Sequence, residues 1–502
     1  MSKTIINNPV IWADVPDPDV IRVDKTFYMV STSMHVMPGC PIMKSEDLMH
    51  WEIVSYVYDV LEENDAHNLA NEKGIYGNGS WAACLRHHKG IFYVCFSSND
   101  MNRFYVYQTH DIDHGKWERF VFEGRHHDPS LLFDDDRVYV VHGNGEIVIT
   151  ELAEDVKSRK PGGIDQLLFS TDKENLLLRG EGTHAYKING CYYFILIEWT
   201  KVGNKRRRQV CYRSRELLGD YEHKVICDDD MGYQNQGIAQ GAIFEINEKG
   251  DWYAMLFQDH GAVGRIPYIL PVAWQNEWPM IGVNGKALKQ FEIDLPCSLE
   301  KPLVISDVFD YQEDRLKLNW QWNHNPDNAL WSVTKRPGYL RLQTGHIANS
   351  VVQARNTLTQ RTEGPACSCS TLMDVSHIKP GDWAGLVALQ GTFGTIGVRL
   401  SDNGEKFVVM SVKGDDREKI VEEKPFQNTA VYLKIDFNFE DSIDLADFSY
   451  SENGEEWLSI GSTLNMKYSL DHFMGYRMGL FNYATVRTDG YVDFAFFHYK
   501  KK

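Results

Sequence analysis

His127-Asp-Pro-Ser-Leu-Leu-Phe-Asp-Asp-Asp-Arg-Val-Tyr-Val-Val-His142 is the stretch from which the fold of this chain can be worked out. It joins an acid before a proline, a short apolar run, an acidic turn and an aromatic strand-like run. Runs of this kind, broken by Gly, Asp and Asn, dominate residues 1–280, and helical periodicity is almost absent. This pattern is typical of all-β proteins.

The turn and aromatic run of this stretch occur five times. The tyrosines of the five copies are 65, 46, 54 and 60 residues apart, and they are Tyr28, Tyr93, Tyr139, Tyr193 and Tyr253. Repeats of this size built from short strands are typical of propeller blades, in which the first strand of each four-stranded sheet lines the central axis. The sequence therefore predicts a five-bladed β-propeller over residues 1–290.

A second set of residues lies 11 to 13 positions before the tyrosines, where the innermost strand of each blade should begin. In chain order these residues are Asp17, Trp81, Asp128, Glu181 and Gln240. Because equivalent positions of a propeller meet at one end of its axis, we expect all five to surround one opening. Three of them are carboxylic acids, whereas a single acid at such a place would be an ordinary turn residue.

Three acids at one axis match the needs of glycoside hydrolysis. One carboxyl group donates a proton to the leaving oxygen, and a second, ionised group activates water or attacks the sugar. A third acid can orient the donor and help it to keep its proton. The alternative is a non-catalytic carbohydrate-binding propeller, which would not need all three acids.

Three motifs resemble those of glycoside hydrolase family 43. They are Pro16-Asp-Pro-Asp-Val-Ile21, His127-Asp-Pro-Ser-Leu131 and Glu181-Gly-Thr-His-Ala-Tyr-Lys187, and their order and spacing within residues 8–282 agree with the family. The resemblance implies an inverting enzyme in which Asp17 is the general base, Glu181 is the general acid and Asp128 keeps the proton on that acid. Inversion requires about 6.5–9.5 Å between the base and acid carboxyls.

The resemblance also implies contacts with the sugar. Arg265 matches a family arginine that contacts substrate hydroxyls, and Trp81 is expected to form a flat apolar wall. Met34 and His35 follow the second strand of the first blade, where family members shape the pocket, and His184 lies in the general-acid motif. The alternative role of Arg265 is a salt bridge at the rim of the pocket. For Trp81, Met34, His35 and His184 the alternative is ordinary packing.

No cofactor is expected for the chemistry, since two carboxyl groups suffice. Many family members carry a histidine near the position of Gln240 that reaches a calcium ion in the axial channel. The carbonyl oxygen of Gln240 is a suitable calcium ligand. The resemblance therefore leaves two readings open, a structural calcium ion at Gln240 or a contact with water alone.

A second all-β region is expected over residues 307–502, after a connector over 283–306. Asn403-Gly404 and Asn453-Gly454 are two-residue hairpin signals. Strands of this kind over about 190 residues predict a jelly-roll-like β-sandwich. The resemblance implies that the sandwich packs on the propeller and lends a loop to the pocket. Asp307 and Asp493 are candidate ligands of a second calcium ion, with surface acids as the alternative.

Bulk properties exclude some partners. The net charge of −18 argues against nucleic acid and anionic membranes. No apolar run is long enough to span a membrane, and residues 1–9 lack the features of a signal peptide, so a cytoplasmic location is expected.

The nine cysteines are expected to be mostly buried thiols. Lys205-Arg-Arg-Arg208 is expected to be a solvated hairpin tip.

The function expected from these observations is an inverting exo-glycosidase. It would release terminal α-L-arabinofuranosyl or β-D-xylosyl units, or both, from hemicellulose. The expected partner is arabinoxylan or a xylo-oligosaccharide, and no oligomeric state is predicted.

Overall fold

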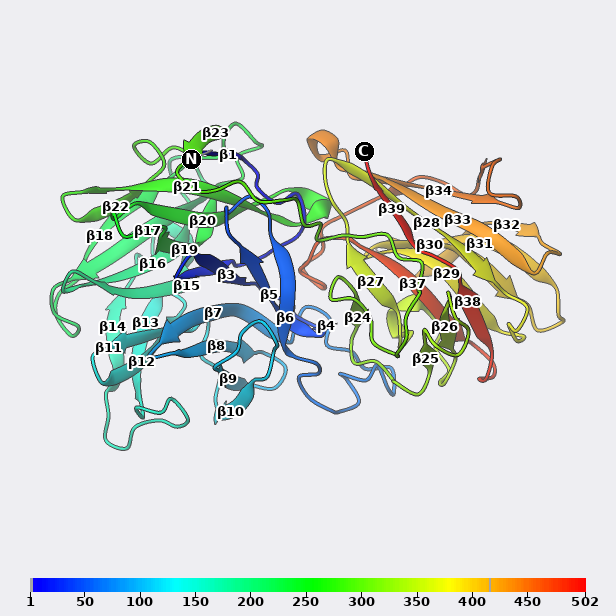
Figure 1. Ribbon diagram of the computed structural model, residues 1–502, viewed down its shortest axis with the longest axis horizontal. Coiled ribbons are helices and arrows are strands. Elements are labelled where there is room, and N and C mark those ends of the chain that lie inside the picture. The colour runs from blue at the N-terminus through cyan, green and yellow to red at the C-terminus, as the bar shows by residue number, and fades with distance from the viewer. Residues whose placement is uncertain (1–2, 415–416) are drawn as a thin grey trace.

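The structure is a computed structural model that describes residues 3–414 and 417–502. Two β-domains lie side by side, a propeller from the N-terminal half of the chain and a sandwich from the remainder (Figure 1). Within the described residues, helical structure is limited to the short 3-10 turns η1 (Gly261–Val263), η2 (Val351–Gln353) and η3 (Glu440–Ser442). None of these described helices has the length and apolar character needed to cross a membrane.

The propeller has five four-stranded antiparallel sheets in the described chain, which confirms the predicted blade count. From the axis outward, the first blade is β2 (Asp19–Val23), β3 (Thr26–Val30), β5 (Gly39–Ser45) and β6 (Glu52–Tyr58), and the second is β7 (Ser80–His88), β8 (Ile91–Ser98), β9 (Arg103–Thr109) and β10 (Glu118–Glu123). The third is β11 (Ser130–Asp134), β12 (Arg137–Gly143), β13 (Glu146–Leu152) and β14 (Asp165–Ser170). The fourth is β15 (Leu176–Ile188), β16 (Cys191–Thr200), β17 (Arg207–Ser214) and β18 (Glu222–Cys227), and the fifth is β19 (Ala239–Glu245), β20 (Trp252–Asp259), β21 (Arg265–Gln275) and β22 (Trp278–Ile281).

The innermost strands form a closed ring. β2, β7, β11, β15 and β19 each contact the next in this order, and β19 contacts β2 again. Outside the blades, β1 (Thr4–Asn7) pairs with β23 (Gln290–Ile293), which ties the start of the propeller to its end. The propeller thus extends to Ile293, three residues beyond the expected limit of 290.

The repeated aromatic pattern has a direct structural basis. Each aligned tyrosine lies in the second strand of its blade, where Tyr253 is half-buried and the other four are buried. Tight turns precede them: Asp24-Lys25 joins paired residues of β2 and β3, and Asp24 has a φ of 55°. Two-residue hairpin turns with this left-handed backbone match the twist of the strands they connect.

The second domain is a β-sandwich, as predicted. One sheet has the order β32 (Glu418–Pro425), β31 (Lys406–Lys413), β30 (Phe393–Leu400), β29 (Asp382–Leu389), β37 (Arg477–Ala484), β27 (Leu358–Arg361), β24 (Gln321–Asn323) and β4 (Val36–Met37). The other has the order β25 (Trp331–Ser332), β26 (Leu340–Gln343), β38 (Tyr491–Phe494), β28 (Ala366–Asp374), β33 (Ala430–Asn438), β34 (Leu445–Ser451) and β35 (Leu458–Ser459), with β36 (Leu464–Asn465) on β34 and β39 (His498–Lys501) on β28.

Both predicted Asn-Gly signals lie between strands of the sandwich. Asn403-Gly404 separates β30 from β31, and Asn453-Gly454 separates β34 from β35. The two sheets bury a continuous core between them that includes Phe437, Phe448 and Tyr476. This core also extends to residues of the fourth and fifth blades, so the two domains pack as one body.

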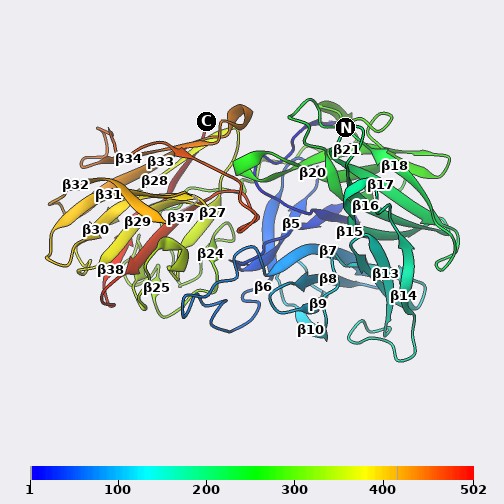
Figure 2. The same cartoon turned by 180° about the vertical axis from the view of Figure 1, so that it is seen from behind.

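The domains share a sheet as well as a core. β4 belongs to the first blade by sequence, yet it pairs with β24 at the edge of the sandwich, Trp322 opposite Met37. Figure 2 shows the two domains side by side from behind. Asp14 adds a second link, since its carboxylate accepts hydrogen bonds from Arg265 N at 2.7 Å and from Gly475 N at 2.9 Å. These contacts fix the sandwich against the mouth of the propeller.

Candidate active site

A pocket of about 610 Å³ lies at the end of the propeller where the innermost strands begin. Its lining includes the three acids predicted from the sequence, each from a different blade: Asp17, Asp128 and Glu181. The sandwich contributes three residues of the segment between β36 and β37: Tyr468, Leu470 and Phe473. The sandwich therefore lends a loop to this pocket, as the resemblance implied.

The backbone takes a left-handed conformation at the start of each blade. The residues with positive φ are Asp17 (51°), Ala82 (37°), Asp128 (45°), Gly182 (65°) and Gln240 (64°). In the second and fourth blades the equivalent position is therefore one residue later than the spacing predicted, at Ala82 and Gly182 rather than Trp81 and Glu181. Both Trp81 and Glu181 still line the pocket.

Asp17 is held as one half of a buried ion pair. Arg265 Nη1 lies 3.0 and 3.1 Å from its two carboxylate oxygens. Thr32 Oγ1 donates to Asp17 Oδ2 at 2.6 Å and accepts from Ala82 N at 2.8 Å. Burial lowers the pKa of Arg265, but Asp17 and Tyr468 more than offset this, so its pKa is raised. The pair presents an oriented carboxylate, the form that a general base needs.

Asp128 and Glu181 form a second group together with His127. His127 Nε2 lies 2.8 Å from Glu181 Oε2 and 3.5 Å from Asp128 Oδ2. Asp128 Oδ2 accepts a hydrogen bond from Gly182 N at 2.8 Å, and Asn144 Nδ2 donates to Glu181 Oε2 at 2.5 Å. His127 and Asn144 are not among the site residues expected from the sequence, although His127 stands next to Asp128 in the motif His127–Leu131.

The surroundings of this group shift the pKa values of Asp128 and His127. Burial, together with the nearby Glu181, raises the pKa of Asp128 even though His127 opposes the shift. Asp128 in turn raises the pKa of His127 to about 9, against burial and with help from Glu181. The protonated form of Asp128 is therefore favoured beside Glu181, because burial and the neighbouring carboxyl both disfavour its negative charge.

His184 does not line the large pocket. It is buried, and its Nδ1 lies 3.3 Å from Asp19 Oδ1. Burial raises the pKa of Asp19, but Arg86 and His184 outweigh it and hold the pKa at about 2. His184 lines a small axial cavity of about 10 Å³ beneath the acids. His184 therefore contacts Asp19 beneath the acids. The resemblance had implied a contact between His184 and the sugar.

Met34 and His35 also lie away from the pocket, which corrects their expected role. Both are fully buried at the junction with the sandwich. The His35 ring packs against Tyr76 at 4.7 Å, His324 at 5.0 Å and His472 at 5.7 Å between centroids. The expectation failed because the chain after β3 turns toward β24 of the sandwich instead of the propeller axis.

Trp81 and Arg265 line the pocket where the two domains meet. The Trp81 ring lies 4.8 Å from the ring of Phe473, and Arg265 Nη2 donates to Phe473 O at 3.2 Å. An indole with a phenyl ring beside it offers the apolar surface on which sugar C–H groups pack. Trp81 from the propeller and Phe473 from the sandwich therefore form one wall of the pocket that contains Asp17.

The basic run Lys205–Arg208 is not the solvated hairpin tip that was expected. Arg206 is buried between Asp228 and Asp230 at 2.7 and 2.9 Å. Arg207 pairs with Asp259, and both line the large pocket. These acids are far from the run in sequence, so the local pattern gave no sign of the pairing.

Gln240 lines both the large pocket and the axial cavity. The axial cavity of about 10 Å³ has room for about one water-sized sphere. Its lining includes Asp17, Asp128 and Gln240, residue types whose oxygen atoms suit calcium. The residues present thus fit a single ion or a single water molecule.

Asp307 and Asp493, the candidate ligands of a second calcium ion, each bind other side chains. Asp307 accepts hydrogen bonds from Trp320 Nε1 at 2.9 Å and Lys317 Nζ at 3.2 Å. Arg341 binds both oxygens of Asp493 at 2.8 Å. Since cations and N–H donors already occupy these carboxylates, an ion would have to displace them.

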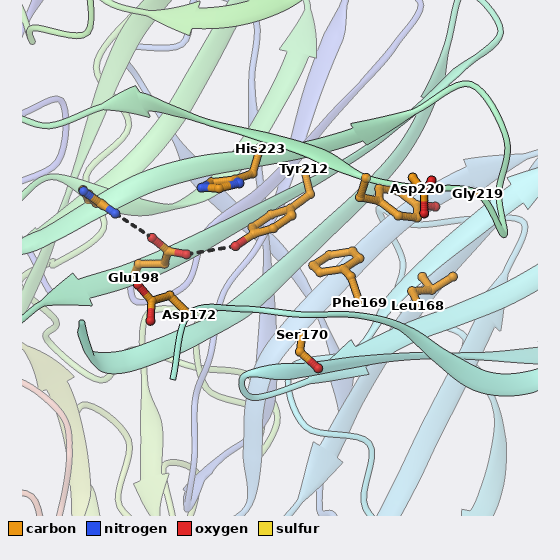
Figure 3. Close-up of a pocket in the computed structure, with 11 residues that line it drawn as sticks. Leu168, Phe169, Ser170, Asp172, Glu198, Tyr212, Gly219, Asp220 and His223 are labelled. Atoms are coloured by element: carbon orange, nitrogen blue, oxygen red, sulfur yellow. Dashed lines mark hydrogen bonds and ion pairs between the residues drawn. The ribbon is translucent and has the colours of Figure 1, made fainter. Parts of the chain in front are cut away.

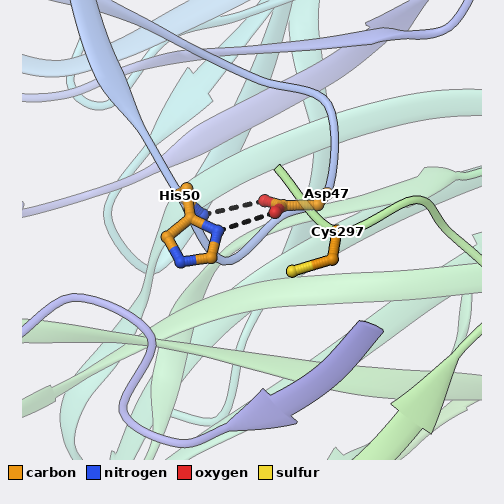
Figure 4. Close-up of side chains that lie close together, drawn as sticks. All are labelled: Asp47, His50 and Cys297. Carbon is orange, nitrogen blue, oxygen red and sulfur yellow. Dashed lines mark hydrogen bonds and ion pairs between the residues drawn. The ribbon is translucent and has the colours of Figure 1, made fainter. Parts of the chain in front are cut away.

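Among the described residues, one further group of potential metal ligands lies outside the pocket: Asp47, His50 and Cys297 (Figure 4). The Asp47 carboxylate accepts hydrogen bonds from the backbone N–H groups of Met49, His50 and Ser298. His50 Nδ1 lies 2.7 Å from the same carboxylate. The group is therefore a capped turn that ties the connector to the first blade.

Comparison with known proteins matches both domains. Residues 6–279 match the family model for glycosyl hydrolases family 43, and residues 306–500 match that for the beta xylosidase C-terminal concanavalin A-like domain. A β-xylosidase of Formosa agariphila is 28% identical over 98% of this chain and 90% of its own. A non-reducing end α-L-arabinofuranosidase of Bacteroides ovatus is 28% identical over 68% of this chain and 66% of its own.

A solved structure extends the likeness to the whole chain. The structure of a bifunctional GH43-CE protein from Bacteroides eggerthii superposes with a TM-score of 0.93 at 43% identity. All of this chain is covered, and it spans 64% of the length of that protein.

Proposed function

The chain belongs to glycosyl hydrolases family 43, and from this premise we propose that it is an inverting exo-glycosidase that releases terminal α-L-arabinofuranosyl or β-D-xylosyl units from hemicellulose oligosaccharides. The names of its relatives, a β-xylosidase and a non-reducing end α-L-arabinofuranosidase, support both sugars. The observation that carries the proposal is the division of three acids into two environments within one pocket, Asp17 with Arg265 and Asp128 with Glu181 and His127.

In the proposed mechanism, Asp17 accepts a proton from a water molecule. The water oxygen forms a bond to the anomeric carbon while the bond from that carbon to the leaving oxygen breaks, and Glu181 donates its proton to that oxygen. Asp128 orients Glu181 by accepting a hydrogen bond from the N–H of the next residue, Gly182. No metal ion is needed for these steps, so a calcium ion at the axis would only support the geometry.

The exo mode of attack rests on the sandwich loop. Tyr468, Leu470 and Phe473 add lining from the second domain to the pocket that holds the acids. A wall from this loop that blocks the passage of a long chain would favour release of single terminal sugars. The non-catalytic alternative would leave the buried acid pair without a purpose.

The test is hydrolysis of phenyl α-L-arabinofuranoside and phenyl β-D-xyloside side by side, aryl substrates whose leaving group benefits from a proton, with Glu181→Ala as the control. Cleavage that the variant loses supports the acid assignment, and the ratio of the two rates identifies the preferred sugar. Proton NMR of the first product formed reports the anomeric configuration, and retention would contradict the inverting mechanism. Absence of cleavage of either substrate would favour the carbohydrate-binding alternative.

A further inference from the structure

A second pocket lies in the groove between the third and fourth blades. It has a volume of about 340 Å³ and shares no lining residue with the large pocket. Figure 3 shows side chains from β14, β16, β17 and β18 gathered around it. It is therefore a separate site on the outer part of the propeller.

The two pockets lie on opposite faces of the same two strands. Glu198–Arg208 and Trp199–Arg207 are successive cross-strand pairs of β16 and β17. Neighbouring residues of a strand point to opposite faces, and accordingly the first pair lines the outer pocket and the second the catalytic pocket. A ligand in the outer pocket would be separated from the catalytic pocket by one sheet.

The floor of the outer pocket has unused hydrogen-bonding capacity. The Glu198 side chain is only 3% exposed, and it accepts bonds from Arg208 Nη2 at 3.1 Å and Tyr212 Oη at 3.2 Å. Each carboxylate oxygen can accept two bonds, so both have one lone pair to spare. Arg208 Nε is buried with no hydrogen-bond partner among the described residues. A spare donor beside spare acceptors suits a pair of hydroxyl groups, each of which donates and accepts.

The walls of the outer pocket are aromatic. The Phe169 ring stacks on Tyr212 with centroids 4.4 Å apart and planes 12° apart, and it lies 5.0 Å from Tyr221. His223 stacks on the other side of Tyr212 at 5.2 Å. Phe169 and Tyr221 are only half-buried, so part of each ring is available to a ligand. Ring faces beside polar groups match the alternating C–H and O–H surfaces of a sugar.

The charges around the outer pocket select against anions. Asp172, Glu198 and Asp220 line it together with a single arginine, Arg208. We propose that this pocket is a second sugar-binding site, which takes a neutral pentose unit of an oligosaccharide and holds a polymeric substrate beside the catalytic pocket. The choice of a pentose rests on the proposed function, whereas the preference for a neutral sugar rests on the pocket itself.

The experiment uses the full chain carrying Glu181→Gln, so that bound carbohydrate is not cleaved. Binding of xylotetraose is measured by calorimetry, and binding of soluble arabinoxylan by affinity electrophoresis. Ser170→Trp fills the mouth of the outer pocket from an exposed position, and Arg208→Gln removes its donor. Ser459→Trp, on an exposed strand of the sandwich, is the matched control.

We expect Ser170→Trp to weaken arabinoxylan binding by about tenfold and Ser459→Trp to leave it unchanged. In the wild-type background, Ser170→Trp should leave kcat/KM on the short aryl pentosides unaltered. Equal binding by the parent, Ser170→Trp and Arg208→Gln would overturn the proposal, as would equal loss in Ser459→Trp. If binding depends on Ser170 but no pentoside is cleaved by the wild type, the second site stands and the proposed catalytic function falls.

Discussion

His127 Nε2 lies 2.8 Å from Glu181 Oε2, which puts a basic ring in direct contact with the proposed general acid. The same ring faces Asp128, and this carboxylate raises the pKa of His127 to about 9. At neutral pH the ring is therefore a cation between two carboxyl groups. This cation opposes the rise in the pKa of Asp128.

Replacing this ring should change the pH dependence of catalysis. In His127→Gln the cation is lost, so Asp128 beside the proposed acid is expected to hold a proton to higher pH. We expect kcat to fall about tenfold, less than the 10²–10⁴-fold typical of losing the acid itself, and the basic limb of the pH–rate profile to move upward. An unchanged basic limb would show that His127 only packs against the acid.

The raised pKa of His127 also predicts a pH effect on stability. The folded pKa of about 9 lies above the ordinary value of 6.5, so the stabilisation is fully present below pH 6.5 and is lost as the pH rises through 9. We expect the Tm of the wild type to fall between pH 6.5 and 9, and that of His127→Gln to fall less. Thermal melts of both proteins across this range provide the measurement.

Removing the general acid should matter most for poor leaving groups. We expect Glu181→Ala to lower kcat by roughly 10²–10⁴-fold on an alkyl or sugar leaving group and by much less on dinitrophenyl pentosides, which leave without protonation. Asp17→Ala, by contrast, should lower the rate on both kinds of substrate alike. Equal losses of Glu181→Ala across the leaving-group series would contradict its assignment as the acid.

Trp81 and Phe473 should act as a unit across the domain interface. Their rings lie 4.8 Å apart, and aromatic pairs of this kind couple by about 0.5–1.5 kcal/mol. We expect Trp81→Ala and Phe473→Ala each to raise KM, and the double variant to raise it by less than the product of the two. If the increase in KM of the double variant equals the product of the two single increases, the two rings contact the sugar independently. Phe407→Ala, distant from the pocket, serves as a control for aromatic truncation in the sandwich.

The buried histidines at the junction predict acid lability. Burial, with Arg477, lowers the pKa of His35 to about 3, and burial also lowers the pKa values of His324 and His472. In the unfolded chain these histidines have the ordinary pKa of 6.5 and bind protons below it, whereas in the folded chain they stay neutral. The free energy of unfolding therefore falls as the pH drops from 6.5 toward 3. The free energy of unfolding falls by at most about 1.4 kcal/mol per pH unit for each histidine.

His472→Phe tests this slope, because the phenyl ring can keep the stacking on Tyr76 at 4.1 Å. We expect the fall in Tm between pH 6.5 and 4 to be smaller in His472→Phe than in the wild type. His110→Phe, at an exposed position, should retain the full wild-type slope. Parallel curves for all three proteins would assign the acid lability to other groups.

Calcium should affect stability without affecting chemistry. We expect treatment with EDTA to leave kcat within about twofold, since the carboxyl groups perform every step. Added calcium should raise the Tm of the wild type and not that of Gln240→Leu. If calcium leaves the Tm of the wild type unchanged, the axial cavity beside Gln240 holds water.

The residues that could be predicted from the sequence are those set by local repeats. The five tyrosines marked the blades because each lies in the second strand of its sheet. Asp17, Asp128 and Glu181 could be found because each precedes a strand whose neighbours in the repeat are recognisable. The spacing misplaced Trp81 and Glu181 by one residue because Ala82 and Gly182 carry the left-handed backbone, which an alignment on tyrosines does not detect.

The residues that could not be predicted depend on contacts between distant segments. Met34 and His35 follow a propeller strand, but β4 leads them into the sandwich. Arg207 stands in a basic run, yet it faces Asp259 from the next blade. Tyr468 and Phe473 reach the pocket from the far end of the chain, where no sequence pattern distinguishes them from other loop aromatics.

The two-residue strand β4 has a practical consequence for building chimeric enzymes. Because Met37 pairs with Trp322, residues 36–37 and 321–323 form one structural unit although they are separated by most of the propeller sequence. A recombined protein that takes its propeller from one relative and its sandwich from another would inherit the two halves of this unit from different parents. Crossovers that move residues 34–38 together with the sandwich should therefore give a higher proportion of folded, active progeny than crossovers placed only in the connector.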